Sequence, residues 1–147
     1  MIYGIGSSYG GNVDMFDEFV QNRVVCIGWP PNDATAIHQM FAGISVGDLI
    51  FIKSFPPSRG LYIKAVGIVK NHEVIDFTDI PSLRQLGYGR EVGWIWHDND
   101  NPVHLGRLED RYDYMRGGSL FQEFGPEVQR HVIDIVLNGH PAAENGN

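Results

Sequence analysis

The feature that most constrains the fold is a pair of long apolar runs in the middle of the chain. Gly47-Asp48 is a turn signal, and it is followed by LIFIKSF at residues 49–55 and LYIKAVGIVKN at residues 61–71. Both runs are rich in β-branched and aromatic residues, and only PPSRG separates them. The pattern therefore predicts an antiparallel hairpin with a rather long connection. Gly67 lies inside the second run and indicates either a bulge or a close approach by another backbone or a ligand.

Shorter patterns place other elements around this hairpin. We expect strands at residues 2–6, 23–28, 72–77 and 90–97, and a final strand or ordered loop at residues 111–118. Apolar residues at helical spacing predict short helices after Asn12 or Asp14, after Asp33, and from Pro126 to Gly139. Because strands dominate the middle and short helices fill the gaps, the fold class that fits best is a small barrel-like α+β domain.

Composition sets the broad class of protein. The chain has 147 residues, so we expect one domain over residues 1–139, followed by a disordered tail over residues 140–147. The sequence contains neither a membrane-spanning apolar run nor a signal peptide, and we expect a cytoplasmic protein with no membrane partner. The single Cys26 lies in an apolar run and is expected to be a buried small hydrophobe.

The charge balance restricts the possible partners. The formal net charge is -7, which argues against broad, sequence-independent binding to duplex nucleic acid. The stretch from Leu49 to His72 nevertheless has no acidic residue and contains four basic ones, Lys53, Arg59, Lys64 and Lys70. This stretch is either a pair of strands with solvated cations or a local basic face that suits one phosphate group or a short single strand.

No motif for catalysis or metal binding stands out. GIGSSYG at residues 4–10 lacks the spacing of a dinucleotide loop, so its glycines indicate a bent backbone or a close ligand. The six histidines show no metal-binding spacing, and no nucleophile motif is present. We therefore expect no metal, no cofactor and no enzymatic activity. Ser7, Ser8 and Tyr9 offer hydroxyl groups at the end of a strand, either for a pocket or for ordinary loop capping.

The aromatic residues carry more information, because several lie on or just beyond strands. Core packing explains most of them, including one of the pair Trp94 and Trp96, which we expect on a shared strand face. Trp29 differs because it follows the strand end and stands between Gly28 and Pro30. A tryptophan fixed at a loop mouth, with an aromatic neighbour, forms a slot that stacks on a planar ring. Tyr9, Phe55, Trp94 and Trp96 are the candidates for the second wall.

The order of these segments resembles a known family. IYGIGSSYGG, MFDEFVQN, VVCIGWP, GDLIFIKSF and LYIKAVGIVKN, over residues 2–71, resemble the EVE domain of the PUA-like superfamily. In particular, the chain is similar to the EVE-like specificity modules of modification-dependent restriction systems, which are relatives of the YTH readers. Such modules usually carry an acid soon after the tryptophan, in a GDLS-like segment, whereas PPNDAT stands there in this chain.

The resemblance implies a fold, a ligand class and a set of site residues. It implies a small, strongly curved mixed β-barrel with short helices packed around it, and an aromatic pocket for a modified base. Trp29 would be a cage wall, and Ser7 and Ser8 would lie on the rim. Lys53, Ser54 and Phe55, in IKSF, are similar to a KS-containing stretch of the YTH relatives, and Arg59 could meet a phosphate. The full candidate set is Ser7, Ser8, Tyr9, Trp29, Lys53, Ser54, Phe55, Arg59, Trp94 and Trp96.

Three functions remain open at this stage. The first is a binding module for a modified nucleobase in single-stranded or flipped nucleic acid. The second is a sequestering binder of a small nucleotide-like ligand, which the acidic balance favours over duplex binding. The third is an acidic protein-interaction or inhibitor domain with a protein partner.

Overall fold

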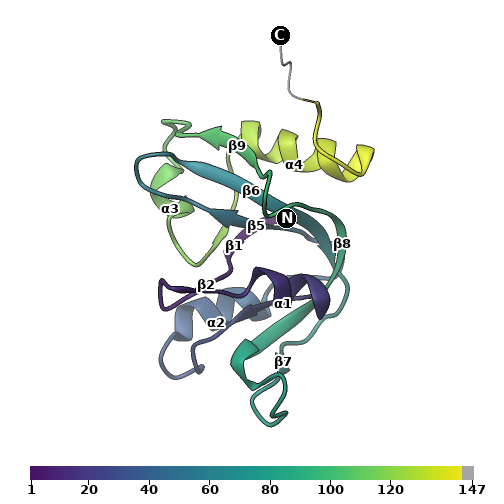
Figure 1. Ribbon diagram of the computed structural model, residues 1–147. Coiled ribbons are helices and arrows are strands. Elements are labelled where there is room, and N and C mark those ends of the chain that lie inside the picture. Colours follow the sequence, from purple (N-terminus) through teal and green to yellow (C-terminus); the bar gives the residue numbers. More distant parts are fainter. Residues whose placement is uncertain (144–147) are drawn as a thin grey trace.

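The protein is a mixed α+β structure built around one strongly curled sheet (Figure 1), and the computed structural model describes residues 1–143. The hydrogen-bonded path of the sheet runs β10 (Leu120–Gln122), β1 (Ile2–Gly6), β5 (Leu49–Ser54), β6 (Leu61–Val69), β8 (Tyr88–His97) and β4 (Val24–Ile27). Two short strands join it from the side: β7 (Ile75–Asp76) pairs with β8, and β9 (Val103–Gly106) pairs with β6. A separate two-stranded ribbon consists of β2 (Ser8–Tyr9) and β3 (Val13–Asp14).

Four short α-helices surround the sheet in the described part of the chain. They are α1 (Phe16–Gln21), α2 (Thr35–Ala42), α3 (Asp113–Arg116) and α4 (Pro126–Asn138), and a 3₁₀ turn covers Arg84–Leu86. β1 and β5 pair in parallel and the other pairings are antiparallel, so the sheet is mixed. Within residues 1–143, the two end strands of the path, β10 and β4, do not pair with each other. The curled six-strand path therefore forms a half-barrel. This agrees with the expected α+β class and curved sheet.

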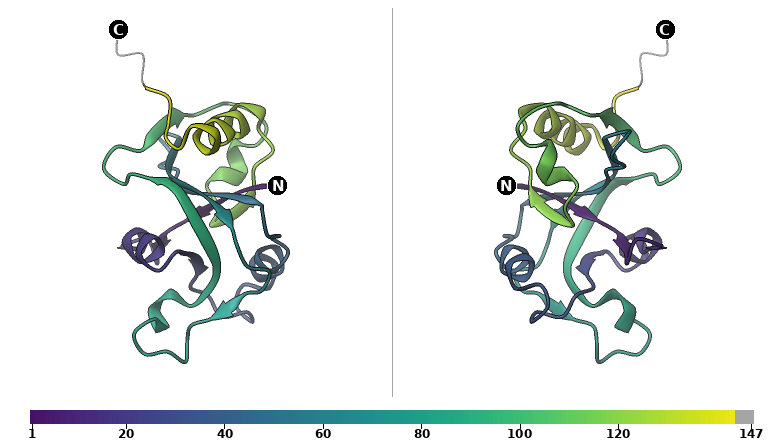
Figure 2. Two further views of the ribbon diagram at one scale, coloured as in Figure 1. Left: turned by 90° about the vertical axis from the view of Figure 1, so that its right-hand side faces the viewer. Right: turned by 90° about the vertical axis from the view of Figure 1, so that its left-hand side faces the viewer.

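The predicted hairpin is the centre of the sheet. β5 and β6 pair antiparallel with the connection expected from PPSRG. The register between β6 and β8 shifts at Val66/Gly67, and a Cβ on Gly67 would lie 2.5 Å from Val92 and 2.8 Å from the carbonyl oxygen of Gly93. Both interpretations of Gly67, a bulge and a close backbone approach, are confirmed. The long arc of β8 links the two halves of the molecule in both views of Figure 2.

Two hydrophobic cores lie on the two sides of the sheet. The first core contains Phe19, Ile50 and Val92, and α1 and α2 flank this half of the molecule on opposite sides (Figure 2). The second core lies under α4, which buries Val128 and Val132 on one stripe. As the sequence predicts, α4 begins with a proline at its first turn and ends at a left-handed glycine.

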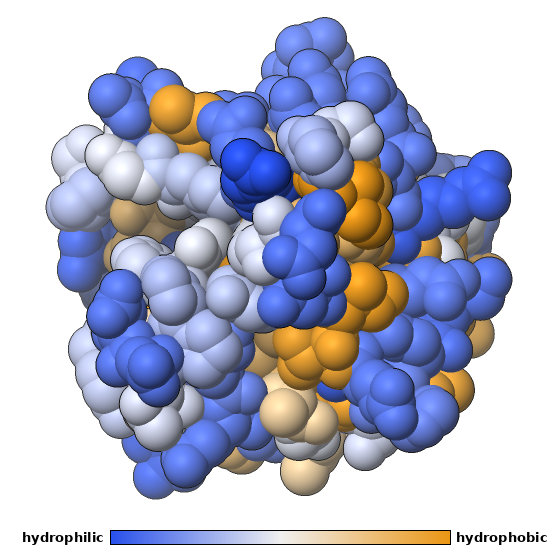
Figure 3. Space-filling model, turned by 90° about the horizontal axis from the view of Figure 1, so that it is seen from below, coloured by the Kyte–Doolittle hydropathy of each residue, from blue (hydrophilic) through white to orange (hydrophobic). Residues whose placement is uncertain are grey.

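The lower end of the molecule is closed by the segment between β6 and β8. Figure 3 shows apolar side chains gathered across the middle of this face. Phe77 is buried there, and its backbone N–H donates to the carbonyl oxygen of Gly87 at 2.9 Å. Ile80 is 43% exposed in the same segment. This segment therefore contributes to the first core through Phe77 while leaving some apolar surface in contact with water.

Several expectations from the sequence are corrected. Residues 111–118 contain the short helix α3 instead of a strand, because the side chain of Arg116 is held by carboxylates on both sides of it. The strands β9 and β10 were not expected, since each is short and has no clear alternation. The bulge in β8 also breaks the expected common face: Trp94 packs against the first core and Trp96 against the second.

Residues 144–147 of the expected disordered tail lie outside the described residues, and Ala142 and Ala143 just before them are exposed. Within residues 1–143, no helix has the length and apolar character needed to cross a bilayer.

Candidate functional site

The site is a pocket where the ends of β1, β2 and β4 meet the connection between α3 and β10. It has a volume of about 230 Å³, and we call it the Trp29 pocket. Its lining residues are Gly6, Ser8, Tyr9, Gly10, Cys26, Ile27, Gly28, Trp29 and Ser119. Three candidate residues from two segments of the sequence, Ser8 and Tyr9 in one and Trp29 in the other, are therefore brought together.

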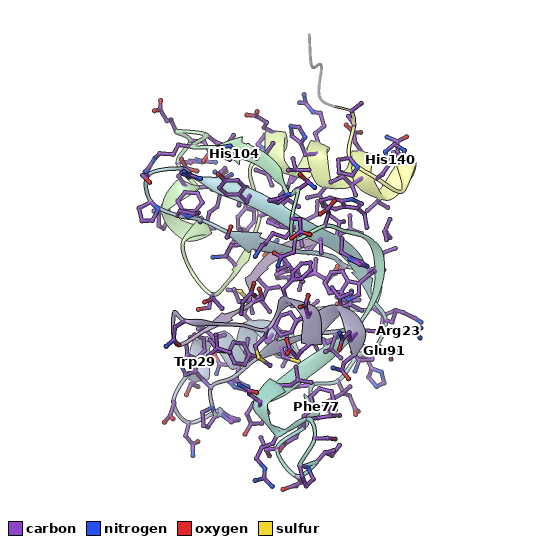
Figure 4. All side chains as sticks on the ribbon, in the orientation of Figure 1. Arg23, Trp29, Phe77, Glu91, His104 and His140 are labelled. Atoms are coloured by element: carbon purple, nitrogen blue, oxygen red, sulfur yellow. The ribbon has the colours of Figure 1, made fainter. Side chains whose placement is uncertain are left out.

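Trp29 stands at the mouth of the pocket with its backbone fixed and its ring in solvent. β4 ends two residues before it, and the residue is 45% exposed. Trp29 is labelled in the lower half of the molecule in Figure 4. The Nε2 atom of His38, on α2, lies 2.7 Å from the Trp29 carbonyl oxygen, which accepts a hydrogen bond when that nitrogen is protonated. The carbonyl oxygen of Pro30 accepts a hydrogen bond from the N–H of Asp33 at 3.0 Å. The indole is thus presented by an ordered turn, which limits the backbone entropy lost on binding a ligand.

Tyr9 forms a fixed wall on the inner side of the pocket. Its hydroxyl donates to the carbonyl oxygen of Leu86 at 2.8 Å, and its ring makes an edge contact with Phe19 at 6.2 Å between centroids. A Cβ on Gly28 would lie 2.9 Å from the Tyr9 ring, so only glycine allows the chain just after β4 to pass this close. Burial raises the pKa of Tyr9 far above its ordinary value, and the phenol is neutral at physiological pH.

The two serines have different roles because they lie on opposite faces of the chain. Ser7 is buried, and its hydroxyl donates to Asp14 Oδ1 at 2.7 Å. The same carboxylate oxygen accepts from the N–H of Phe16 at 3.1 Å, which satisfies a donor at the start of α1. Ser8 is exposed and lines the pocket. Ser7 therefore supports the rim, whereas Ser8 is the hydroxyl that a ligand can reach.

Lys53 lies beside the pocket without lining it. β1 and β5 pair so that Lys53 is opposite Gly6, and its Nζ lies 3.8 Å from where a Cβ on Gly6 would stand. The residue is only 8% exposed, and burial lowers the pKa of its ammonium group from 10.5 to about 8. The Nζ atom lies 5.8 Å from the Phe121 ring centroid, and no hydrogen bond or ion pair reaches it from the described residues. It is a cation next to the pocket floor with unused hydrogen-bonding capacity.

The remaining candidate residues lie away from the pocket. Phe55 and Trp96 pack against the second core. Trp94 packs against the first core, and its indole N–H donates to the Phe19 carbonyl oxygen at 3.2 Å. Ser54 ends β5, and Arg59 is exposed in the β5–β6 connection. The pocket thus has Tyr9 as its second aromatic wall.

The sequence did not single out four of the lining residues, Cys26, Ile27, Gly28 and Ser119, as parts of the site. Cys26 is buried as expected, and burial raises its pKa, so its thiol is protonated and a poor nucleophile. Gly28 directly precedes Trp29, and this position was the only sequence signal that could have placed Gly28 at the site. Ser119 is more than 100 positions from Tyr9 in the chain and gave none.

The lining chemistry suits a neutral planar ligand. The lining residues include no charged side chain, and they combine apolar surface with serine hydroxyls and backbone groups. No group of three His, Cys, Asp or Glu side chains in residues 1–143 is arranged to hold a metal ion. Ring stacking and hydrogen bonding to a ring edge are the interactions this arrangement can provide.

Neither a scan against protein-family models nor a search of curated proteins finds a match to this chain.

Proposed function

We propose that residues 1–139 form a non-enzymatic binding module that recognises a modified nucleobase in single-stranded or flipped nucleic acid. The observation that carries this proposal is Trp29, which is 45% exposed and held by an ordered turn of the backbone at the mouth of a pocket whose inner wall is Tyr9. An exposed aromatic face next to an uncharged recess is the usual arrangement for stacking a heterocycle.

The size of the pocket limits its occupant. Drug-sized ligands occupy pockets of roughly 300–1,000 Å³. The Trp29 pocket, at about 230 Å³, is smaller, and it suits a single ring system with a small substituent. A sugar and its phosphates would stay outside, as they do when one base of a strand is held in a protein.

The energetics favour a base that is already unstacked. Stacking on an aromatic side chain contributes roughly 1–3 kcal/mol per base. Extruding a base from a duplex costs a few kcal/mol. Stacking on Trp29 alone would barely offset that cost, so binding to a duplex requires Tyr9 and hydrogen bonds inside the pocket as well. A single-stranded base has no such cost and would bind more readily.

Two further observations support this function. The segment order over residues 2–71 resembles the EVE domain, whose pocket holds a modified base next to the tryptophan of the IGW segment. The ammonium group of Lys53 adjoins the pocket floor and could donate to an acceptor on the base or its substituent, through the space that Gly6 leaves open.

A free nucleoside-like ligand is the second candidate, and the charge distribution favours it. None of the lining residues is cationic, and the chain has a formal net charge of -7. A polymer with many phosphates would meet few cations around this pocket, whereas a free nucleoside needs none. A base in a nucleic acid strand and a free nucleoside would bind the same surface of the pocket with their rings. They differ in whether a phosphate backbone continues outside the pocket.

The experiment is a titration followed by tryptophan fluorescence and calorimetry. The ligands are unmodified and modified nucleosides, their 5′-monophosphates and short single-stranded oligonucleotides. Trp29→Ala should weaken binding by about 5- to 150-fold, which corresponds to roughly 1–3 kcal/mol of stacking. Tyr114→Ala is the matched control, because Tyr114 is an 81% exposed aromatic residue that does not line the pocket.

Salt separates the two candidates. Binding of an oligonucleotide should weaken steeply between about 50 and 200 mM salt, whereas binding of a nucleoside should hardly change. If no ligand binds the folded protein, or if Trp29→Ala and Tyr114→Ala behave alike, the base-binding proposal is wrong. The acidic protein-interaction domain would then be the remaining candidate.

A further inference from the structure

β4 is the last strand of the hydrogen-bonded path, so one of its edges has no partner strand in residues 1–143. In an antiparallel pair, alternate residues direct both their N–H and their C=O either toward the partner strand or away from it. The register of β4 against β8 therefore decides which backbone groups point to the free edge. Cys26 is paired with Gly89, and Val25 with Arg90.

Two hydrogen bonds around β8 settle this alternation. The N–H of Val92 donates to the carbonyl oxygen of Arg23 at 2.9 Å, in continuation of the β4–β8 register. The N–H of Lys70 donates to the carbonyl oxygen of Glu91 at 2.8 Å, which shows that Glu91 faces β6 instead of β4. Odd-numbered residues of β4, such as Val25, therefore bond to β8.

The even-numbered residues of β4 direct their backbone groups to the free edge, and Cys26 does so at the pocket. Cys26 lines the Trp29 pocket and is 1% exposed. The register leaves its backbone N–H and C=O without a partner on β8, and β4 is the last strand of the path in residues 1–143. More than about 90% of buried backbone polar groups in proteins have a partner. A donor and an adjacent acceptor that point away from the sheet, on a residue that lines a small pocket, form an edge with which a ligand can pair.

We propose that the backbone N–H and C=O of Cys26 together read the hydrogen-bonding edge of the bound nucleobase. This inference rests on the proposed function and specifies its ligand. The ligand must present an acceptor beside a donor, as the ring nitrogen and exocyclic group of adenine, cytosine, guanine and uracil do. The face of the base stacks on Trp29, and its hydrogen-bonding edge points to the backbone of Cys26. A ligand is therefore unsubstituted at that ring nitrogen, and any modification that the module recognises lies elsewhere on the base.

An extended peptide is the other occupant that a free strand edge can accept, by adding a strand to β4. The structure favours the base. β4 has only four residues and ends before Pro30-Pro31, which limits the ladder that a peptide could form. The recess at Cys26 holds about 230 Å³ between Tyr9 and Trp29, which is room for a single base.

The test compares neutral ligand pairs that differ only at this edge. The pairs are guanosine with 1-methylguanosine, uridine with 3-methyluridine, 5-methylcytidine with its 3-deaza analogue, and N6-methyladenosine with its 1-deaza analogue. For whichever parent nucleoside binds, we expect the altered partner to bind at least about 5-fold more weakly, since each change removes one hydrogen bond, worth about 1 kcal/mol, and leaves its backbone partner at Cys26 unpaired. In ¹⁵N-labelled protein, the Cys26 amide should move downfield and exchange more slowly. The amide of Val25, already bonded to β8, should not change.

Each outcome distinguishes this inference from the function on which it rests. If a nucleoside binds in a Trp29-dependent manner, but its edge-altered partner binds equally well and the Cys26 amide does not respond, the edge-reading inference is wrong and the proposed function stands. If no nucleoside binds, the proposed function is wrong. If a terminally blocked tripeptide of valine and threonine residues shifts the Cys26 amide while no nucleoside does, the edge binds a peptide strand. Both the edge-reading inference and the proposed function are then overturned.

Discussion

Arg116 is the side chain whose removal the structure predicts to be most costly. It is fully buried and makes five hydrogen bonds to three carboxylates. Its guanidinium group contacts Asp110 and Asp113 at 2.7 Å and Glu123 at 2.8 Å. These contacts join α3, the loop before it and the residue after β10. They also hold the connection that carries Ser119 to the pocket.

We expect Arg116→Met to lower the free energy of unfolding by about 3–4 kcal/mol at pH 7. Breaking a buried ion pair by removing one partner costs about 3–5 kcal/mol, because the remaining charge is left without compensation. The side chain of Glu123 is 1% exposed, which places it at the costly end of that range. The side chain of Asp110 is 30% exposed and can be partly rehydrated, which reduces the loss.

The assay is urea unfolding at pH 7 and at pH 4 and below, with Arg130→Met as the control. Arg130 is an exposed arginine on α4, and its loss should change stability by no more than about 0.5 kcal/mol. Hydrogen bonding to Arg116 is the main cause that holds the pKa of Asp110 below its ordinary 3.8. The stability from this carboxylate is present above about pH 4 and is lost as the pH falls through the lowered pKa.

The stability difference between wild type and Arg116→Met should therefore narrow as the pH falls below 4. A loss below about 1 kcal/mol at pH 7, or one equal to that of Arg130→Met, would refute the reasoning. It would mean that desolvating the four charged groups cancels their attraction.

Three further substitutions probe the sheet and the pocket. Gly67→Ala should lower stability by about 1–3 kcal/mol in a thermal melt, because its Cβ would lie 2.5 Å from Val92, whereas Gly117→Ala meets nothing within 4 Å and should be nearly neutral. Lys53→Met should raise stability at pH 7 by up to about 3 kcal/mol, since a pKa lowered from 10.5 to about 8 disfavours the folded protonated form. That gain in stability should shrink above pH 8, where Lys53 loses its proton in the folded wild type before it does so in the unfolded chain. If the variant is less stable than wild type in urea at pH 7, the conclusion that the Lys53 ammonium group is unpaired is contradicted. Gly28→Ala should weaken nucleoside binding in the fluorescence titration while the protein stays folded, because its Cβ would displace the ring of Tyr9; unchanged affinity would show that this wall does not contact the ligand.

The elements that the sequence predicts correctly are those with a strong local pattern. The β5–β6 hairpin is marked by two long apolar runs, and α4 by a clear stripe between a proline and a glycine. The helix α3 and the strands β9 and β10 have at most four residues each, too few to show a period. Arg116 was not identified as an organising residue, because nothing in RYDYMRGG indicates that its side chain is buried among acids.

The site is predicted unevenly for a related reason. Trp29 was a candidate because it follows a strand end between Gly28 and Pro30, and Tyr9 because it lies at a strand end and could form a second wall. The structure places both at one pocket. Trp94 and Trp96 were expected on one face because a regular strand alternates, but the irregular register between β6 and β8 sends them to different cores. A single bulge is therefore enough to remove two aromatic side chains from the candidate wall.

The edge of β4 shows why the remaining part of the site required the structure. The sequence context of Cys26 predicts a small buried hydrophobic residue, and its side chain is buried in the structure. The proposed recognition groups are its backbone N–H and C=O, which every residue except proline possesses. Their direction depends on the register against β8, which lies more than 60 positions away in the chain. A shift of one residue would turn the backbone groups of Cys26 toward β8 and those of Val25 toward the free edge. Side-chain chemistry alone could not have located this part of the site, because its specificity would come from the register of a strand.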